Sequence, residues 1–401
     1  MSRNELALYG TTNEIREEIN IRSGDISDEE ALNIIERFVF SHERFSFFPR
    51  AEKSAIINRI FCSLRKDLDI LQPYADDEEV SEIMVNGKDE IFIERRGKIE
   101  KADTYFERTE DLEEVIRRVC AKVHREINEL NPIADARLPD GSRVSAVHKN
   151  VAINGPALTI RKFPKKEITM QELISNGTIS REAAEFLGKL TESGYNIFVS
   201  GGTSSGKTTF LNVLSDFIPA DERVVVIEDS AELKINGIKN IVRLECRNAN
   251  VQGKGKVDMR QLIKTSLRMR PNRIIVGEVR GEEVVDMIQA MNTGHDGSLS
   301  TGHGNSIEGM LLRLEAMFLQ AADFPIDAIR AQIAEGIDII VHMGRLSGND
   351  RKVLEIAEIT GVNSSKISVS TLFKFKSDTG LVKCGQGLMN KEKLDLRGIV
   401  L

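Results

Sequence analysis

Cysteine is scarce in this sequence. The four cysteines among the 401 residues, Cys62, Cys120, Cys246 and Cys384, are scattered, and no two of them form a C-x-x-C pair. A disulfide framework and a structural zinc site both need cysteines in closer groups, so the sequence encodes neither. This usage is typical of a reducing compartment, and we expect a cytosolic protein.

Long apolar runs are also missing. No window approaches the roughly 18 consecutive apolar residues of a membrane-spanning helix. Residues 1–6 lack the basic and then apolar pattern of a secretory signal. We therefore expect no transmembrane segment, and a protein of this kind reaches a membrane only through its partners.

The chain has no excess of positive charge. It carries 55 lysines and arginines against 62 aspartates and glutamates, a formal net charge of −7. This balance gives no general footprint for the polyanionic backbone of nucleic acid. We expect no direct nucleic-acid partner, and any basic binding surface must be local.

Residues 1–72 predict a small helical module in a chain long enough for two or three domains. Apolar residues recur at helical spacing in residues 31–39 and 56–64. The acidic segment 25–30 places N-cap candidates and first-turn carboxylates ahead of the first long helix, where the helix dipole favours them. Two interpretations stay open, a solvated appendage and a module that docks on a partner.

Residues 73–165 predict a compact α+β domain. A turn at Asn86-Gly87 between two strand-like runs is a hairpin signal. A helix-like segment follows at residues 112–119. The strand-like runs are residues 82–87, 90–95, 144–147 and 157–160. Residues 161–166 then form a polar, proline-bearing connection.

Residues 166–401 predict an α/β domain. Helical segments alternate there with short apolar runs, a pattern typical of a sheet covered by helices on both faces. The apolar runs are residues 196–200, 223–228, 273–277 and 338–341.

A phosphate-binding loop lies near the start of this domain. Residues 201–208 read G-G-T-S-S-G-K-T and satisfy G-x-x-x-x-G-K-[ST] in full, between a strand-like and a helix-like run. Glycines let successive backbone N–H groups turn inward on a phosphate, and the helix N-terminus adds partial positive charge. Lys207 should reach the β- and γ-phosphates, and Thr208 should ligate Mg²⁺. We expect ATP and Mg²⁺ as ligands, bound by Gly201, Gly202, Thr203, Ser204, Ser205, Gly206, Lys207, Thr208 and Thr209.

Hydrolysis also needs a carboxylate near the metal or the attacking water. Glu228 and Glu278 each follow an apolar strand directly, at the place where ligands bind an open α/β sheet. We expect the two strands to flank the P-loop strand, so that both carboxylates converge on Mg²⁺. The alternative is that each acid begins a solvated loop.

Two of the six histidines, His295 and His303, fall in the glycine-rich stretch 291–305. Crowded glycines indicate close approach of the backbone to a ligand. A histidine there could donate a hydrogen bond to the γ-phosphate or report its loss after cleavage. The alternative is a structural or surface role, which we assign to the other four histidines.

Together these elements resemble the set that defines the secretion ATPase superfamily, the hexameric motors of type II and type IV secretion and of type IV pili. The matching Walker A, Asp, Walker B and His boxes are residues 201–209, 227–232, 267–281 and 293–305. Three further segments are similar to the CpaF branch, which serves Tad/Flp pili. These are residues 136–144, 155–163 and 291–298.

The resemblance covers about residues 75–360 and implies a RecA-like P-loop ATPase domain preceded by a smaller α+β domain, with ATP between them. It implies that Glu278 is the Walker B acid, a metal ligand with Thr208, and that Glu228 is the catalytic acid of the Asp box. His295 and His303 would be the catalytic pair of the His box.

The resemblance also implies that Arg143 and Arg161 of the smaller domain face the phosphates and take part in catalysis. A guanidinium suits that role because it is planar and permanently charged. An ordinary surface role for both stays open, and Arg137 is a weaker candidate.

The sequence departs from the family in two places. Gly302 and Gly304 stand where the pattern has a bulkier residue before the second histidine and alanine after it. The tetracysteine zinc cluster of the type II and type IVa/IVb assembly ATPases is missing. The first departure bears on the rigidity of that loop, and the second argues against those two groups.

The implied function is that of a hexameric ATPase that hydrolyses ATP to power assembly or retraction of a Tad/Flp-type (type IVc) pilus. Such a motor is cytoplasmic and lies at the inner face of the cell membrane, bound to an inner-membrane platform protein. Three alternatives stay open: a type IV secretion ATPase, a nucleotide-dependent assembly platform with little hydrolysis, and a RecA-like nucleic-acid motor, which the acidic balance disfavours.

Overall fold

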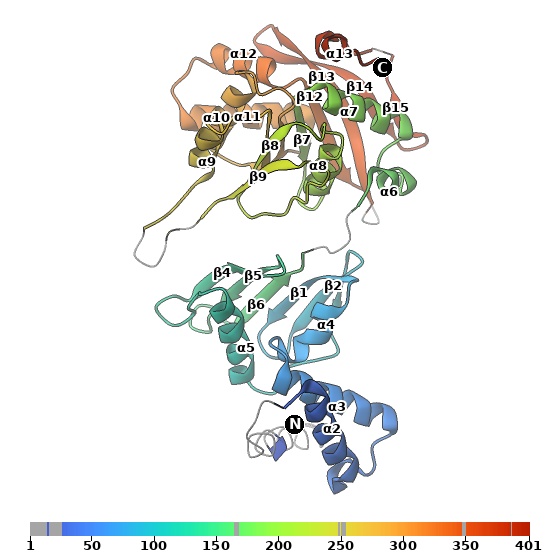
Figure 1. Ribbon diagram of the computed structural model, residues 1–401, viewed down its shortest axis with the longest axis vertical. Coiled ribbons are helices and arrows are strands. Elements are labelled where there is room, and N and C mark those ends of the chain that lie inside the picture. Colours follow the sequence, from blue (N-terminus) through green and yellow to red (C-terminus); the bar gives the residue numbers. More distant parts are fainter. Residues whose placement is uncertain are drawn as a thin grey trace. The chain divides into compact units, whose positions relative to one another are not determined.

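The computed structural model describes residues 14–15, 26–163, 168–247, 249, 254–346, 350–385 and 387–401. The chain divides into two compact units, residues 1–165 and 166–401 (Figure 1). The second half of the predicted connection at 161–166 lies outside the described residues, as does much of the sequence before residue 26. No helix of the described segments is long and apolar enough to cross a membrane.

The first unit begins with a pair of helices, α2 (Asp28–Ser41) and α3 (Arg50–Arg65). Ser27 caps α2 as expected, because its hydroxyl accepts the Glu30 N–H while the Glu30 carboxylate accepts the Ser27 N–H. Apolar side chains spaced three or four residues apart pack the two helices together. The predicted boundary at residue 72 stays a prediction, since residues 1–165 form a single unit.

An antiparallel six-stranded sheet forms the rest of the first unit, in the order β3-β2-β1-β6-β5-β4. The hairpin prediction is confirmed: β1 and β2 pair with Val85 opposite Ile91, and Gly87 takes a φ of 83° in the turn. Short helix α4 (Gln72–Asp76) precedes the sheet, and α5 (Thr109–Lys122) packs its apolar face on it. The strands are β1 (Val80–Asn86), β2 (Ile91–Arg95), β3 (Lys98–Lys101), β4 (Ile133–Arg137), β5 (Arg143–Val147) and β6 (Ala157–Arg161).

The second unit is built on a nine-stranded sheet in the order β15-β14-β13-β12-β7-β11-β10-β8-β9. Six strands, from β12 to β9 in that order, are parallel, and β13, β14 and β15 extend the sheet with antiparallel pairs. The strands are β7 (Ile197–Gly201), β8 (Arg223–Glu228), β9 (Asn240–Glu245), β10 (Arg273–Val279), β11 (Leu299–His303), β12 (Ile339–Arg345), β13 (Arg351–Asn363), β14 (Lys366–Lys376) and β15 (Gly380–Lys383).

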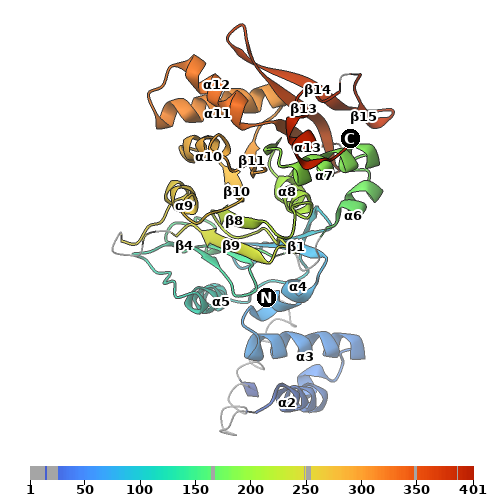
Figure 2. The same ribbon diagram turned by 45° about the horizontal axis from the view of Figure 1, so that its top comes forward.

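Helices cover both faces of this sheet, which confirms the α/β prediction (Figure 2). Neighbouring strand residues enter different cores: Val199 packs with α7 and α8, whereas Phe198 packs with α9 to α12. Because both faces are buried, the strands read as unbroken apolar runs. The helices are α6 (Met170–Ser175), α7 (Arg181–Ser193), α8 (Lys207–Ser215), α9 (Met259–Ser266), α10 (Glu283–Met291), α11 (Ile307–Ala321), α12 (Ile326–Gly336) and α13 (Glu392–Arg397).

The strand order corrects one expectation. The strands that carry Glu228 and Glu278 do not flank the P-loop strand, because β7 has β12 on one side and β11 on the other. Strand β11, which was not predicted, is short and reads Leu-Ser-Thr-Gly-His, too polar to stand out as a buried strand. Its position places His303 between the P-loop strand and the strand of Glu278.

Candidate active site

The P-loop connects the end of β7 to the start of α8. Gly206 takes a left-handed conformation, with a φ of 95°, immediately before the helix begins at Lys207. A Cβ at Gly201 would lie 2.5 Å from Ser205 Oγ and 2.6 Å from the Met343 carbonyl, so only glycine fits there. The N–H groups of the first turn of α8 have no partner within the helix and are available to an anion.

Lys207 lies in the mouth of this loop. Its Nζ donates to the carbonyls of Gly201 at 3.1 Å and Gly202 at 2.9 Å, and lies 3.4 Å from His303 Nδ1. Burial lowers the pKa of Lys207, and the nearby Glu278 carboxylate opposes that shift. The side chain is therefore a buried cation that contacts only neutral groups directly. An anionic phosphate would be a better partner.

Glu278 completes a chain of contacts that begins at Lys207. Glu278 Oε1 lies 2.7 Å from His303 Nε2, and Glu278 Oε2 accepts from Arg280 Nε at 2.8 Å. Burial and the Lys207 charge lower the pKa of His303 despite the nearby carboxylate, so the imidazole is neutral at pH 7. Its two ring nitrogens thus link the P-loop lysine to the expected Walker B acid.

Glu228 ends β8 and is almost fully buried, 4% exposed. Its Oε1 accepts the N–H groups of Glu232 at 2.8 Å and Leu233 at 3.0 Å, which orders the loop after the strand. Burial raises the pKa of Glu228, and these two hydrogen bonds oppose the rise. The side chain lies against β10, since a Cβ at Gly277 would be 3.0 Å from Glu228 Cγ. It is beside the strand of Glu278 but makes no hydrogen bond to the Lys207–His303–Glu278 chain.

His295 lies at the other end of β11. Its Nδ1 is 3.2 Å from the Ala290 carbonyl, and its own carbonyl accepts the Ser298 hydroxyl at 2.7 Å. Asn196 holds the same loop by accepting the Ser298 N–H at 3.0 Å. Because β11 separates the two histidines, one chain does not bring His295 to Lys207, and its catalytic role stays a prediction.

Arg143 and Arg161 lie in the first unit, on neighbouring strands. They are direct partners in the β5–β6 register, and Arg143 is also the partner of Arg137 on β4. Like charges opposite one another destabilise a sheet unless an anion compensates them. Glu82 on β1 stands opposite Arg161 and balances part of this charge. The row of arginines suits an anionic ligand, and the roles of Arg143 and Arg161 stay predictions.

Sequence reasoning missed Arg280. Its guanidinium donates to Glu278 and lies 3.9 Å from Asp229 Oδ2, so it joins the acids of two strands. The signal was its position two residues after Glu278, just past the end of β10, where alternate side chains still point to the same side.

The residues present fit a magnesium nucleotide. Thr208 and Thr209 lie in the first turn of α8, half-buried. No group of three or more acidic, histidine or cysteine side chains among the described residues could hold a metal by itself. Mg²⁺ does not need such a cage, because it commonly binds one or two protein oxygens together with substrate phosphates and water.

Comparison with known proteins identifies the family to which this chain belongs. The family model described as "Type II/IV secretion system protein" matches residues 65–387. The chain is 42% identical over 242 residues to an uncharacterised protein of Methanocaldococcus jannaschii, covering 58% of this chain and 33% of that protein. It is 32% identical over 308 residues to the conjugal transfer protein TrbB of Rhizobium radiobacter, covering 76% of this chain and 91% of that protein.

A solved structure shows the same fold. The pilus retraction motor PilT with bound ADP aligns with a TM-score of 0.53 at 18% identity, over 82% of this chain and 86% of that one. Three observations indicate the same family: the P-loop, the parallel sheet and the family match over residues 65–387. With its RecA-like nucleotide-binding domain after a smaller α+β domain, the chain belongs to the type II/IV secretion ATPase family and is an ATP hydrolase.

Proposed function

We propose that this chain forms a ring, with six subunits, that hydrolyses ATP to assemble or retract a Tad/Flp-type pilus. The contact chain from Lys207 through His303 to Glu278 is the observation that carries the hydrolytic part. The CpaF-like segments at residues 136–144, 155–163 and 291–298 favour the pilus.

In this proposal Lys207 exchanges its loop carbonyls for the β- and γ-phosphates. Thr208 and Glu278 would hold Mg²⁺, which would neutralise charge on the phosphates. Neutral His303 donates a hydrogen bond to the γ-phosphate. A water attacks the γ-phosphorus, the bond to the bridging oxygen breaks, and ADP leaves. The water's proton passes to Glu228, whose raised pKa suits a general base.

In this proposal, hydrolysis of the nucleotide moves the two units of the chain. Arg143 and Arg161 supply charge to the phosphates, either in their own subunit or in the next one. Losing the γ-phosphate would weaken that attraction and let the two units move, a common way to turn phosphate contacts into motion. The moving ring would act on an inner-membrane platform protein from the cytoplasmic face of the membrane. His295 would then act at a site that the ring completes.

Turnover separates this motor from an assembly platform that only binds ATP. Lys207→Ala and Glu278→Gln should each lower ATP turnover by about a thousandfold, because each removes charge stabilisation in the transition state. Glu278→Gln should still bind nucleotide. Turnover at the wild-type rate in Glu278→Gln would contradict the assigned site.

Ring formation has its own measurement. Mass measured with and without ATP and Mg²⁺ should show a shift to the hexamer, accompanied by rising turnover per subunit. A strictly monomeric species at full activity would contradict the ring but leave the hydrolytic site intact.

A type IV secretion or conjugation ATPase is the second candidate. The relatives that support it include TrbB and, at 31% identity, a type IV secretion protein of Bordetella pertussis, PtlH. Disrupting the gene in its own organism discriminates the two. Loss of surface pili with normal DNA transfer and protein export supports the pilus motor, and the reverse supports the secretion ATPase.

A further inference from the structure

Arg351 lies beside the P-loop, although it is far from the loop in the sequence. Strand β12 pairs with the P-loop strand, with Met343 opposite Gly201, and β13 returns antiparallel to β12. The start of β13 therefore lies at the same edge of the sheet as the loop. Arg351 Nε donates to the Ser204 carbonyl at 3.1 Å, and a Cβ at Gly206 would be 3.3 Å from its Cδ.

The carbonyl that Arg351 holds belongs to a constrained residue. Ser204 has a φ of 58°, a left-handed conformation that a residue with a side chain keeps only where its surroundings hold it. The Ser204–Ser205 peptide bond is trans, so the Ser204 carbonyl and the Ser205 N–H point in opposite directions. While the carbonyl faces Arg351, the N–H faces the loop interior, where it lies 3.4 Å from the Gly202 carbonyl.

The charge around Arg351 also indicates an anionic ligand. Arg345 is its direct partner in the β12–β13 register, so two exposed arginines stand opposite one another beside the loop. Such a pair is unfavourable by itself. Within the part of the chain that the structure describes, no carboxylate forms an ion pair with either guanidinium.

We propose that Arg351 is a nucleotide-positioning residue, which orients the Ser204–Ser205 peptide so that its N–H faces the phosphates. The P-loop thus depends on a strand that the nucleotide-binding motifs do not include. Arg351 does not take part in the chemical step, so its loss weakens nucleotide binding and leaves the rate of the bound complex nearly unchanged.

The test compares two arginines that carry the same charge. Arg351→Met keeps the length of the apolar stem and removes the donors, whereas Arg345→Met removes equal charge without touching the loop. A fluorescent ADP analogue reports the Kd, and steady-state turnover of ATP reports KM and kcat. Arg351→Met should raise both Kd and KM about tenfold, the usual range for losing one hydrogen bond to a charged donor. Its kcat should stay within about twofold, and Arg345→Met, which lowers only the exposed charge, should raise Kd and KM by less than about threefold.

Two results would overturn the assignment. Equal losses of affinity in Arg351→Met and Arg345→Met would mean that both act only through charge, and wild-type affinity in Arg351→Met would mean no role. Arg351→Lys retains a donor and should recover part of the affinity. If thermal unfolding shows that Arg351→Met does not fold, Arg351→Lys is compared with Arg345→Met instead. A loss of affinity in Arg351→Lys no greater than that in Arg345→Met would reject the proposal. Wild-type protein that binds no ADP analogue would contradict the family's nucleotide site and not this residue.

Discussion

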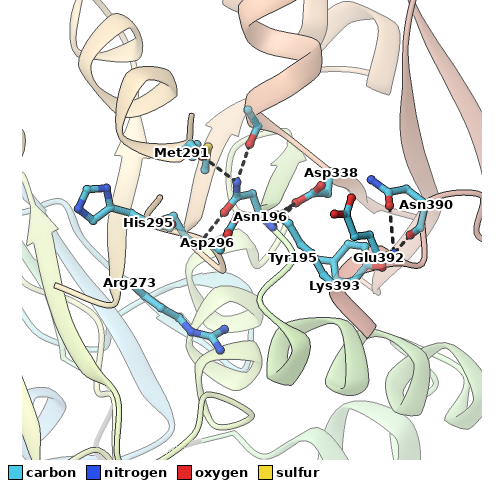
Figure 3. A network of polar contacts seen from close by, with 12 residues as sticks. Tyr195, Asn196, Arg273, Met291, His295, Asp296, Asp338, Asn390, Glu392 and Lys393 are labelled. Carbon is cyan, nitrogen blue, oxygen red and sulfur yellow. Dashed lines mark hydrogen bonds and ion pairs between the residues drawn. The ribbon is translucent and has the colours of Figure 1, made fainter. Parts of the chain in front are cut away.

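In the second unit, charged side chains lie at the carboxyl ends of the parallel strands, here called the carboxyl edge, and at their amino ends, the amino edge. The contacts that these side chains make differ between the two edges. At the carboxyl edge, Lys207, His303 and Glu278 form a chain in which each contact can be exchanged for a ligand. At the amino edge, Asp338 is bound by Lys393 Nζ at 2.7 Å and by the Asn196 N–H at 2.7 Å (Figure 3). The second arrangement satisfies its charges internally.

The C-terminal segment closes the amino edge. The Glu358 carboxylate accepts the N–H groups of Met389 and Asn390, and Tyr195 donates its hydroxyl to the Asn390 carbonyl. Burial, reinforced by Asp338, raises the pKa of Tyr195, so it stays a donor through the physiological range. Charged groups therefore stabilise the fold at one edge and remain available for chemistry at the other.

Breaking the amino edge should have the largest effect on stability. Asp338→Ala leaves the Lys393 ammonium, among the described carboxylates, with the exposed Asp296 alone, and removes the acceptor of the Asn196 N–H. Because the pair is only half-buried, losing one partner should cost about 2–3 kcal/mol in the free energy of unfolding, measured by denaturant titration, less than for a fully buried pair. Turnover per folded molecule should change little.

The matched control is Glu182→Ala, which removes an exposed pair with Lys383 in the same unit. Its cost should be under about 1 kcal/mol. If Glu278→Ala at the carboxyl edge destabilised the protein as much as Asp338→Ala, the distinction between the two edges would fail.

Much of the carboxyl edge could be predicted from local pattern. The P-loop motif encodes its own backbone conformation, and apolar runs that end in acids place Glu228 and Glu278 at strand ends. Strand order is not encoded locally, since it depends on which strands pack beside one another. The polar β11 was therefore missed, and with it the contact of His303 with both Lys207 and Glu278.

Long-range contacts were missed for the same reason. Arg351 reaches the P-loop only because β12 and β13 form a hairpin next to β7. Tyr195 and Asn390 are 195 residues apart in the chain. No periodicity or spacing indicates such pairs, whereas the capping box at Ser27 involves residues three apart and could be expected from the sequence.

His295 and His303 lie at opposite ends of β11, so they test the comparison of the two edges along one strand. His303→Ala removes the link between Lys207 and Glu278 and should lower kcat about a hundredfold, the usual size for a positioned acid–base or hydrogen-bonding group. His295→Ala should change kcat less than about twofold at protein concentrations where mass measurement shows monomers. Its effect should grow only when rings form. A loss in monomeric His295→Ala equal to that of His303→Ala would place both at one site within a chain.

The smallest effect on stability should come from Glu228, which combines the features of both edges because it is buried yet needed for turnover. Its pKa is raised in the folded protein, so the fold binds the proton more tightly than the unfolded chain does. Ionisation at neutral pH therefore costs stability. Glu228→Gln keeps an acceptor for the Glu232 and Leu233 N–H groups and cannot ionise. It should abolish turnover and raise the free energy of unfolding at pH 7 by about 1 kcal/mol or less, the size of common stabilising substitutions. Denaturant titrations from pH 7 downward should show this gain shrink as the wild-type carboxyl becomes protonated, and a gain that widens toward acid pH would refute the assignment.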